Sequence, residues 1–361
     1  MYQRNISILM ILTIFVIGIG CGEEDSIMVL SVNPPNGDTI TTDSIILVKF
    51  SGTPENLTVS KGDVAENEDS ISISGPFQLG DLTIEIDWDG GNHTLSYKVI
   101  EAEVGIPEGM VLIPEGDFKF GYLSDEAGTV EQTGETIYLD SFYIDQKEVT
   151  NQDFKMFIDK NPNWNKENID SNFHDGNYLS NWDGNNFPID KADHPVVYVS
   201  WYASVAYARW LDKRLPTEAE WEKAARGGVD GLKYPWGNTI DDKKANYTLN
   251  VGVTGNTTPV GNYPPNDFEI YDIVGNVLEW CIDRYDRNFL EDIVEKNPIG
   301  GEETVNEINE KYLKISSSRS IRGGSWVESG QPRIWITYRR GNEPARTSHL
   351  IGFRCAKSVS Q

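Results

Sequence analysis

The sequence predicts an α+β protein in which a small β-sandwich precedes a larger domain with little regular secondary structure. Three observations support this fold class. Short segments rich in β-branched residues lie within residues 27–103, at the spacing expected of strands. Helix-capping patterns follow in residues 150–228. Long stretches rich in glycine, asparagine and proline, such as residues 161–193 and 230–266, separate the regular elements of the second domain.

The first domain is predicted to be all-β over residues 27–103. Ser44–Phe50 alternates poorly but is rich in β-branched residues, whereas Leu82–Trp88 alternates well. Asp89–Gly91 is a turn sequence, and His93–Ile100 returns as the partner strand. Short strands at this spacing favour a β-sandwich, and the segment resembles bacterial immunoglobulin-like spacer domains.

Three helices are predicted in the second domain. The first runs from a Thr150 cap to about Asp159. The second spans Trp201–Leu211 and is capped by the serine before it. The third opens with a T-x-x-E capping box at Thr217 and ends at the glycine pair 227–228.

Composition limits the classes of partner. The chain has 361 residues, 10 tryptophans and a formal net charge of −25. This length and aromatic content predict two folded domains rather than disorder. The negative charge argues against nucleic acid or anionic lipid as a partner. It makes calcium a reasonable ligand, because calcium prefers oxygen donors. Gly105–Pro107 marks the predicted domain boundary, and every tryptophan except Trp88 follows it.

The N-terminus is predicted to direct export. The apolar stretch Ile6–Ile19 is too short to span a bilayer comfortably, so residues 1–20 are interpreted as a signal peptide. Gly18–Cys21 resembles a bacterial lipobox, in which Cys21 is the lipidated residue. The first glycine of this motif stands where a leucine-like residue is usual, so plain secretion is the alternative. We therefore expect a protein of the bacterial cell envelope that contacts the membrane only through a lipid anchor.

Two further cysteines, Cys281 and Cys355, follow in the second domain. Outside the reducing cytosol a disulfide between them is possible. Two separate buried thiols agree equally well with the sequence. The sequence leaves both alternatives open.

A series of short motifs covers the second domain. They are Gly109–Gly116, Glu148–Asn151, His194–Val196, Lys213–Glu222, Tyr234–Asn238, Gly275–Trp280, Arg322–Trp326 and Gly352–Ala356. In this order they closely resemble the sulfatase-modifying factor family, which includes the formylglycine-generating enzyme. The resemblance covers about residues 107–357. It implies a compact domain related to the C-type lectin fold.

The resemblance also implies which residues would carry chemistry. In active members of the family, two cysteines bind copper(I) and dioxygen and oxidise a substrate cysteine to formylglycine. Their positions correspond here to Glu328 and Arg333. Copper(I) is selected by soft sulfur ligands, which neither side chain supplies. Cys281 and Cys355 do not replace them by spacing. We therefore expect copper not to be a cofactor, and the catalytic residues stay unassigned.

Calcium is the cofactor that the resemblance favours, as a structural ion. The implied ligands of one site are the side chains of Asp272 and Glu279 and the backbone carbonyls of Gly275 and Val277. Each of these positions can donate oxygen, as a hard cation requires. A second site would use Asn246 and Tyr247, but the carboxylate expected near residues 252–254 is missing. The alternative for the first site is a turn with a solvated Glu279.

A cleft is expected where active relatives carry out their chemistry. The candidates that would line it, beside Glu328, are Trp326, Trp335, Arg339, Arg340 and His349. Aromatic faces next to arginines suit recognition of carboxylates, sulfates or peptide backbone. Core tryptophans with arginines in structural ion pairs are the alternative interpretation.

Three functions agree with these features. The first is an exported binding or accessory module stabilised by calcium, whose partner is an exported protein or peptide. The second is a protein-modifying oxidoreductase of the same family with a divergent active site. The third is a carbohydrate-recognition module with a glycan partner, which rests on fold analogy alone. The oligomeric state does not follow from the sequence.

Overall fold

The structure, a computed structural model, divides into two compact units, Met1–Val104 and Gly105–Gln361. The boundary expected at Gly105–Pro107 lies at this division. The signal segment and Cys21 lie outside the described residues. Within the described residues, no helix has the length and apolar character needed to cross a membrane. The described residues are 27–42, 44–100, 105–121, 134–248, 255–289, 293–301, 303–328 and 332–359.

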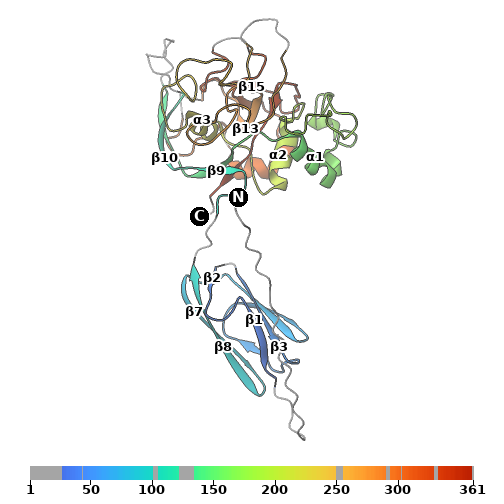
Figure 1. The fold of residues 1–361 in the computed structure, drawn as a ribbon, viewed down its shortest axis with the longest axis vertical. Coiled ribbons are helices and arrows are strands. Elements are labelled where there is room, and N and C mark those ends of the chain that lie inside the picture. Colours follow the sequence, from blue (N-terminus) through green and yellow to red (C-terminus); the bar gives the residue numbers. More distant parts are fainter. Residues whose placement is uncertain are drawn as a thin grey trace. The chain divides into compact units, whose positions relative to one another are not determined.

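The first unit consists of two four-stranded sheets, in the strand orders β1-β3-β6-β5 and β2-β8-β7-β4 (Figure 1). The two sheets share one hydrophobic core, which includes Ile46, Ile84 and Leu95. This arrangement is the predicted β-sandwich. The strands are β1 (Val29–Asn33), β2 (Thr39–Thr41), β3 (Ile45–Phe50), β4 (Thr58–Val59), β5 (Asp63–Asn67), β6 (Ser70–Ser74), β7 (Gly80–Trp88) and β8 (Gly91–Ile100).

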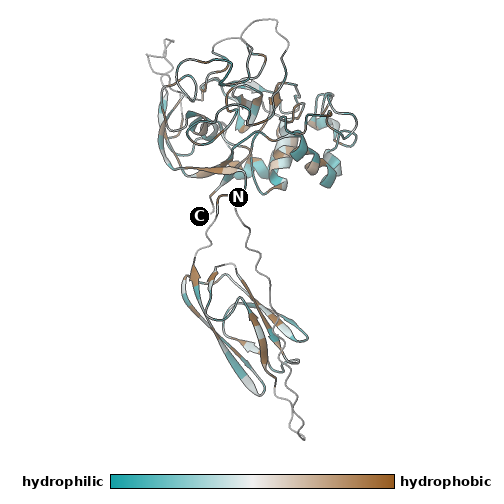
Figure 2. Ribbon diagram, viewed as in Figure 1, coloured by the Kyte–Doolittle hydropathy of each residue, from teal (hydrophilic) through white to brown (hydrophobic). Residues whose placement is uncertain are grey.

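Alternating side chains build this core. β7 and β8 pair as an antiparallel hairpin in which Trp88 lies opposite Gly91. Hydrophobic and hydrophilic residues alternate along these strands (Figure 2). β3 alternates in burial too, although its sequence is apolar on both faces. Ile45 and Leu47 are 61% and 49% exposed, so the poor sequence alternation reflects apolar residues on the outer face.

The three predicted helices of the second unit begin at their predicted caps, whereas a fourth, α4, was not predicted. α1 (Asn151–Lys160) and α3 (Glu218–Arg226) each open with a capping box at a threonine, and Ser200 caps α2 (Trp201–Trp210). Gly227 ends α3 in the left-handed conformation, with φ at 60°. The short α4 (Val305–Lys311) and the 3₁₀ turns Pro162–Trp164, Ser171–Phe173 and Tyr312–Lys314 complete the helical elements described.

Short strands complete the second unit, with the orders β10-β11, β17-β12-β9 and β15-β14-β13-β16. Mixed helices and short strands joined by long loops are the predicted α+β architecture. The strands are β9 (Met110–Ile113), β10 (Gly116–Phe120), β11 (Glu135–Leu139), β12 (Phe142–Asp145), β13 (Leu278–Arg284), β14 (Arg319–Arg322), β15 (Arg340–Asn342), β16 (Ile351–Gly352) and β17 (Ala356–Ser358).

β13 separates two hydrophobic cores. Its side chains alternate, so that Trp280 and Ile282 pack in the core with α1 and α2, whereas Cys281 packs in the core with α3. Figure 1 shows β13 between α3 and α2. Because both faces of this strand are buried, polar side chains on it need internal partners.

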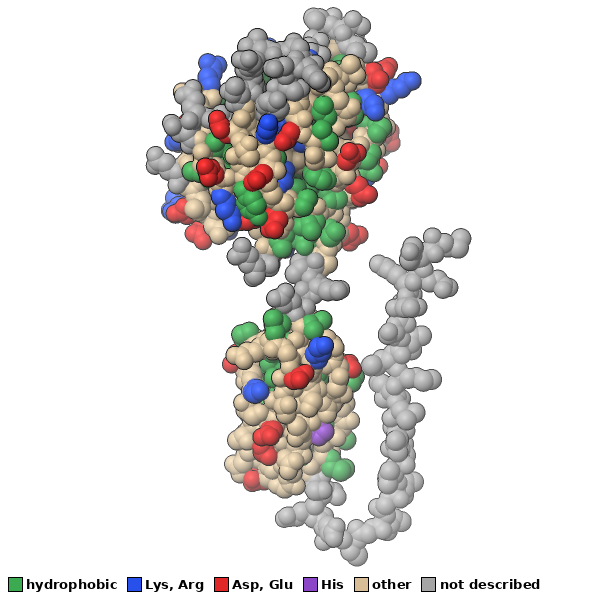
Figure 3. Space-filling view, turned by 90° about the vertical axis from the view of Figure 1, so that its left-hand side faces the viewer, with side chains coloured by type: hydrophobic (Ala, Val, Ile, Leu, Met, Phe, Trp, Pro, Cys, Tyr) green, Lys and Arg blue, Asp and Glu red, His purple; other side chains and the backbone are tan. Residues whose placement is uncertain are grey.

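The surface of the second unit carries both charge signs. On the face in Figure 3, acidic and basic side chains are interspersed, and hydrophobic side chains gather along one border. A mixed surface of this kind does not attract one polyion over the whole face.

Candidate functional site

The helix α3 carries buried charges that cross-link it to the β14 strand. Glu218 and Glu222 are fully buried. Arg322 donates to both, at 3.2 Å to Glu218 Oε2 and 2.6 Å to Glu222 Oε2. Arg339 donates to the two oxygens of Glu218 at 2.6 and 2.9 Å. Burial alone would raise the pKa of Glu218, but the two guanidinium groups outweigh it and lower that pKa. Each charge has a partner, so this centre is structural.

Glu279, a predicted calcium ligand, lies on β13 and faces a buried arginine. Arg354 Nε donates to Glu279 Oε2 at 2.8 Å, and Arg354 Nη2 donates to Oε1 at 2.7 Å. Trp221 Nε1 also donates to Glu279 Oε2, at 2.8 Å. The expected alternative of a solvated Glu279 is wrong, because this residue is only 1% exposed. Each oxygen already accepts at least one hydrogen bond, although a carboxylate oxygen can accept a further ligand.

Two more carboxylates lie near this pair. Asp272 Oδ2 accepts a hydrogen bond from the Gly261 amide at 2.5 Å, and Glu148 Oε2 accepts one from Asn276 Nδ2 at 2.8 Å. The other oxygen of each group is buried and has no hydrogen-bond partner among the described residues. Burial raises the pKa of Asp272 to about 6, and burial with the charge of Asp272 raises the pKa of Glu148 well above its usual value.

The fit of these groups to a calcium ion is partial. Two buried carboxylate oxygens without partners are suitable donors for a hard cation. Gly275 lies close to the predicted second site, because a Cβ there would be 2.5 Å from the Asn246 carbonyl oxygen. Tyr247 follows in the same loop, and residues 252 and 254 are outside the described part of the chain. The described residues contain no cluster of three or more His, Cys, Asp or Glu side chains arranged for a metal.

Glu328 and Arg333 both follow the β14 strand in the sequence. Arg333 Nη1 lies 3.4 Å from Glu328 Oε2, so the two side chains form an ion pair. Glu328 is buried, and its backbone is held by hydrogen bonds to Ser325 and Thr248. Arg333 is largely exposed. The two family positions therefore face each other, but they carry opposite charges and no sulfur.

A cavity of about 460 Å³ lies beside this loop. Two cleft candidates, Trp326 and His349, line it, and their ring centroids are 5.7 Å apart. Lys191, His194 and Tyr198 also line it and were not predicted. The order of residues along the chain cannot show that these five side chains share a cavity.

The other cleft candidates lie elsewhere. Trp335 is buried in the core with α3, and Lys233 Nζ lies 5.2 Å from the centroid of its ring. Arg339 is bonded to Glu218 in the structural centre. Arg340 lies exposed on β15. Trp335, Arg339 and Arg340 therefore do not line the described cavity with Trp326.

Cys281 and Cys355 are free, fully buried thiols in different cores. The structure therefore favours the separate-thiol alternative. Burial raises the pKa of both thiols well above the usual range. A thiol that stays protonated is a poor metal ligand and a poor nucleophile.

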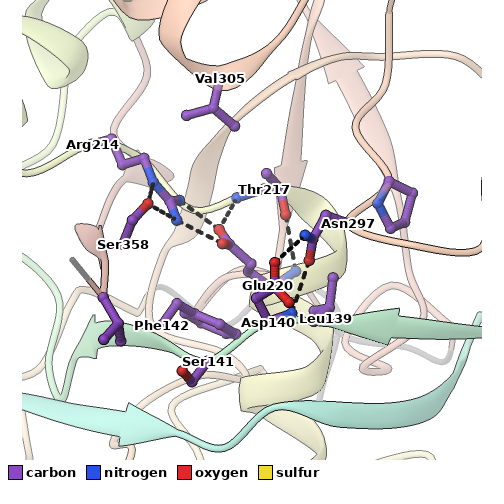
Figure 4. A pocket seen from close by; sticks show the side chains of 12 residues that line it. Leu139, Asp140, Ser141, Phe142, Arg214, Thr217, Glu220, Asn297, Val305 and Ser358 are labelled. Atoms are coloured by element: carbon purple, nitrogen blue, oxygen red, sulfur yellow. Dashed lines mark hydrogen bonds and ion pairs between the residues drawn. The ribbon is translucent and has the colours of Figure 1, made fainter. Parts of the chain in front are cut away.

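A second cavity, about 310 Å³, is lined by residues of β11, β17 and the start of α3 (Figure 4). Arg214 donates to the two oxygens of Glu220 at 2.6 and 2.7 Å, and the Thr217 amide donates to Glu220 at 2.9 Å. Ser358 accepts from Arg214 as well. In Figure 4 the charged groups are paired, Arg214 with Glu220 and Asp140 with Asn297, so we interpret this cavity as structural.

The comparison with protein families decides the assignment. A family model described as "Sulfatase-modifying factor enzyme 1-like domain" matches residues 97–359. The chain belongs to this family.

Similar proteins agree with the family. The chain is 32% identical over 295 residues to the formylglycine-generating enzyme of Thermomonospora curvata, covering 70% of this chain and 94% of that protein. It is 36% identical over 257 residues to a Chlamydia pneumoniae protein named serine/threonine-protein kinase pkn1, covering 70% of this chain but only 38% of that protein's length. Among solved structures, PvdO from Pseudomonas aeruginosa matches with a TM-score of 0.53 and 25% identity, covering 69% of this chain and 94% of that one.

Proposed function

We propose that this sulfatase-modifying-factor-like protein is an exported, lipid-anchored binding or accessory module that does not oxidise thiols with copper. The observation that carries the proposal is the Glu328–Arg333 ion pair at the family's two cysteine positions. A guanidinium repels a cation, and a carboxylate is a hard ligand that copper(I) does not prefer. Cys281 and Cys355 are buried in separate cores, so they offer no alternative sulfur pair.

A copper(I) titration tests this proposal. The full chain is titrated with copper(I) against a competing chelator, beside the double variant Glu328→Cys/Arg333→Cys. We expect no tight copper(I) binding by the natural chain. We expect the double variant to bind one ion, because its two sulfurs would replace side chains that already face each other. Tight copper(I) binding by the natural chain would contradict the proposal.

Calcium is proposed as a structural ion held by Asp272, Glu279 and the carbonyls of Gly275 and Val277. Its support is the group of buried carboxylates around Arg354: Glu279, Glu148 and Asp272 all interact with this guanidinium, Lys147 is a further cation near Asp272, and Asp272 Oδ1 has no hydrogen-bond partner among the described residues. A bound cation would balance this charge. It would fix the loop before β13 and thereby the position of Trp326, whose amide donates to the Asn276 carbonyl at 3.0 Å.

Thermal melting with calcium or with a chelator tests this site. Calcium at about 100 times its Kd would stabilise the folded chain by about 2.7 kcal/mol. Asp272→Asn should remove most of this shift, whereas Asp242→Asn at an exposed position should retain it. If the chelator leaves the melting temperature unchanged and elemental analysis finds no bound calcium, the proposal is wrong.

Export and anchoring are proposed from residues 1–21 alone. Cells grown with labelled palmitate should transfer the label to the full chain and not to a Cys21→Ser variant. Release of the unlabelled natural chain into the medium would instead indicate plain secretion.

A further inference from the structure

The cavity beside Trp326 is built by segments that are far apart in the sequence. Its lining comes from the start of α1, the loop before α2, the segment 255–257, the loop after β14 and His349. Its volume of about 460 Å³ suits a small ligand or the side chain of a peptide.

The floor of the cavity carries a lysine beside a histidine. Lys191 Nζ lies 3.4 Å from His194 Nε2 and 3.5 Å from His194 Nδ1, and Thr257 Oγ1 lies 2.9 Å from that Nδ1. Burial and then the charge of Lys191 lower the pKa of His194, whereas the hydrogen bond with Thr257 and the charge of Asp193 act in the opposite direction. A neutral imidazole can accept from the ammonium group. Lys191 then has further N–H donors to offer to a ligand.

One wall of the cavity is aromatic. The ring of His349 lies between Trp326 and Tyr198, at centroid distances of 5.7 and 6.0 Å. Gly255 contacts Trp326 closely, because a Cβ at that glycine would lie 2.7 Å from the indole ring. The indole is therefore held against backbone. It offers a fixed surface on which the apolar part of a ligand, such as the methylene groups of a side chain, can pack.

The lining contains no carboxylate among the described residues. This is unusual in a chain with 56 acidic and 31 basic side chains. Asp190 and Asp193 flank Lys191 in sequence but are not part of the lining. The charged and polar groups that face the cavity therefore favour an anion over a cation.

We propose that this cavity binds the carboxylate of an acidic side chain of a peptide, with Lys191 as its charged partner and the Trp326–His349 wall against its stem. The inference rests on the proposed binding function and specifies its ligand. A carboxylate only accepts hydrogen bonds, and Lys191 only donates them. The amide side chains of Asn181 and Asn256 also line the cavity and can pair with peptide backbone.

A peptide is favoured over a sugar for a related reason. Sugar hydroxyls donate hydrogen bonds, which carboxylates accept strongly, and in calcium-dependent sugar sites the hydroxyl oxygens coordinate the ion. The described lining provides neither. Peptide amides are satisfied by the asparagine side chains, so the lining matches an acidic peptide more closely.

The test is a titration of the full chain, followed by NMR of its histidine rings, with two probes that differ in one group. The probes are acetyl-Gly-Glu-Gly-amide and acetyl-Gly-Gln-Gly-amide, and methyl glucuronide is a third. We expect the glutamate peptide to bind and shift the His194 and His349 resonances. Lys191→Met should weaken its binding by about tenfold or more, because a charge-assisted hydrogen bond is lost.

Lys244→Met is the matched control, because Lys244 is partly exposed like Lys191 but lies outside the cavity. It should bind the glutamate peptide as the natural chain does. Both variants should have the same melting temperature as the natural chain. Equal binding of the two peptides, no binding of either, or an unaffected Lys191→Met variant would overturn the inference. Tighter binding of methyl glucuronide would overturn the peptide assignment. These results leave the copper(I) titration unchanged, so the two proposals fail separately.

Discussion

Replacing Arg354 by methionine would remove the group that holds the loops around β13 together. The guanidinium donates to both oxygens of Glu279. It also donates to three backbone carbonyls at 2.9 to 3.1 Å, those of Asp145, Gln146 and Tyr271. Every N–H of the guanidinium is therefore used. Lysine has fewer donors and cannot reproduce this geometry.

The expected cost follows from these contacts. Removing one partner of a buried ion pair costs about 3–5 kcal/mol, because the remaining charge is buried and unpaired. Three carbonyls also lose a donor, which adds to this figure. A total of about 5 kcal/mol is comparable with the whole stability of a marginal domain. In a domain of this size it corresponds to a fall in the melting temperature of about 10–20 °C.

Urea unfolding and thermal melting of the full chain measure the loss. Arg346→Met is the control, because the Arg346 side chain is 57% exposed and lies 3.5 Å from Asp175. An exposed pair of this kind should cost below about 1 kcal/mol. Adding Glu279→Gln to Arg354→Met should recover part of the loss, because the unpaired charge is then removed. A loss below about 1 kcal/mol for Arg354→Met would refute this reasoning.

Three further predictions concern titration, capping and the thiols. Burial and the charge of Glu218 raise the pKa of Asp283 to about 7, so the native state holds a proton that the unfolded state releases. The free energy of unfolding should fall as pH rises from about 4 to about 7, and Asp283→Asn should reduce this slope in urea titrations; an unchanged slope would contradict the assignment. Thr217→Ala removes the α3 cap and should cost about 1 kcal/mol in denaturant unfolding, and no loss would mean that the box is not stabilising. Iodoacetamide should label Cys281 and Cys355 only after denaturation, because both thiols are buried; a peptide map showing them joined would exclude free thiols.

α1, α2 and α3 were predictable because their start and stop residues are local, although α4 was missed despite its capping box at Thr304. Thr150 and Thr217 sit three residues before acidic partners, and both capping boxes form. The charges of α3 were not predictable in the same way. Glu218 and Glu222 look like exposed helix residues, yet Arg322, about one hundred positions away, pairs with both in the core. Burial that depends on distant partners leaves no periodic pattern in the sequence.

The candidate site was predictable only in part, for a similar reason. Trp326, Trp335 and Arg339 are expected in one cleft because the family resemblance implies that chemistry occurs there in active relatives. Trp335 packs in the core with α3 and Arg339 pairs with Glu218, so that of these three residues Trp326 alone lines the cavity. Lys191 joins it there from a loop more than one hundred residues earlier. The positions of Glu328 and Arg333, in contrast, followed from the family motif.

The most direct test of the central claim is a turnover measurement on the natural chain. The purified protein is incubated with copper(I), dioxygen, a thiol reductant and a cysteine-containing sulfatase peptide. The mass of the peptide is then measured by mass spectrometry. Because Glu328 and Arg333 occupy the two metal positions, we expect the cysteine to stay unmodified and the mass of the peptide to stay unchanged. Repeated conversion of that cysteine to the aldehyde, dependent on copper, would contradict the account.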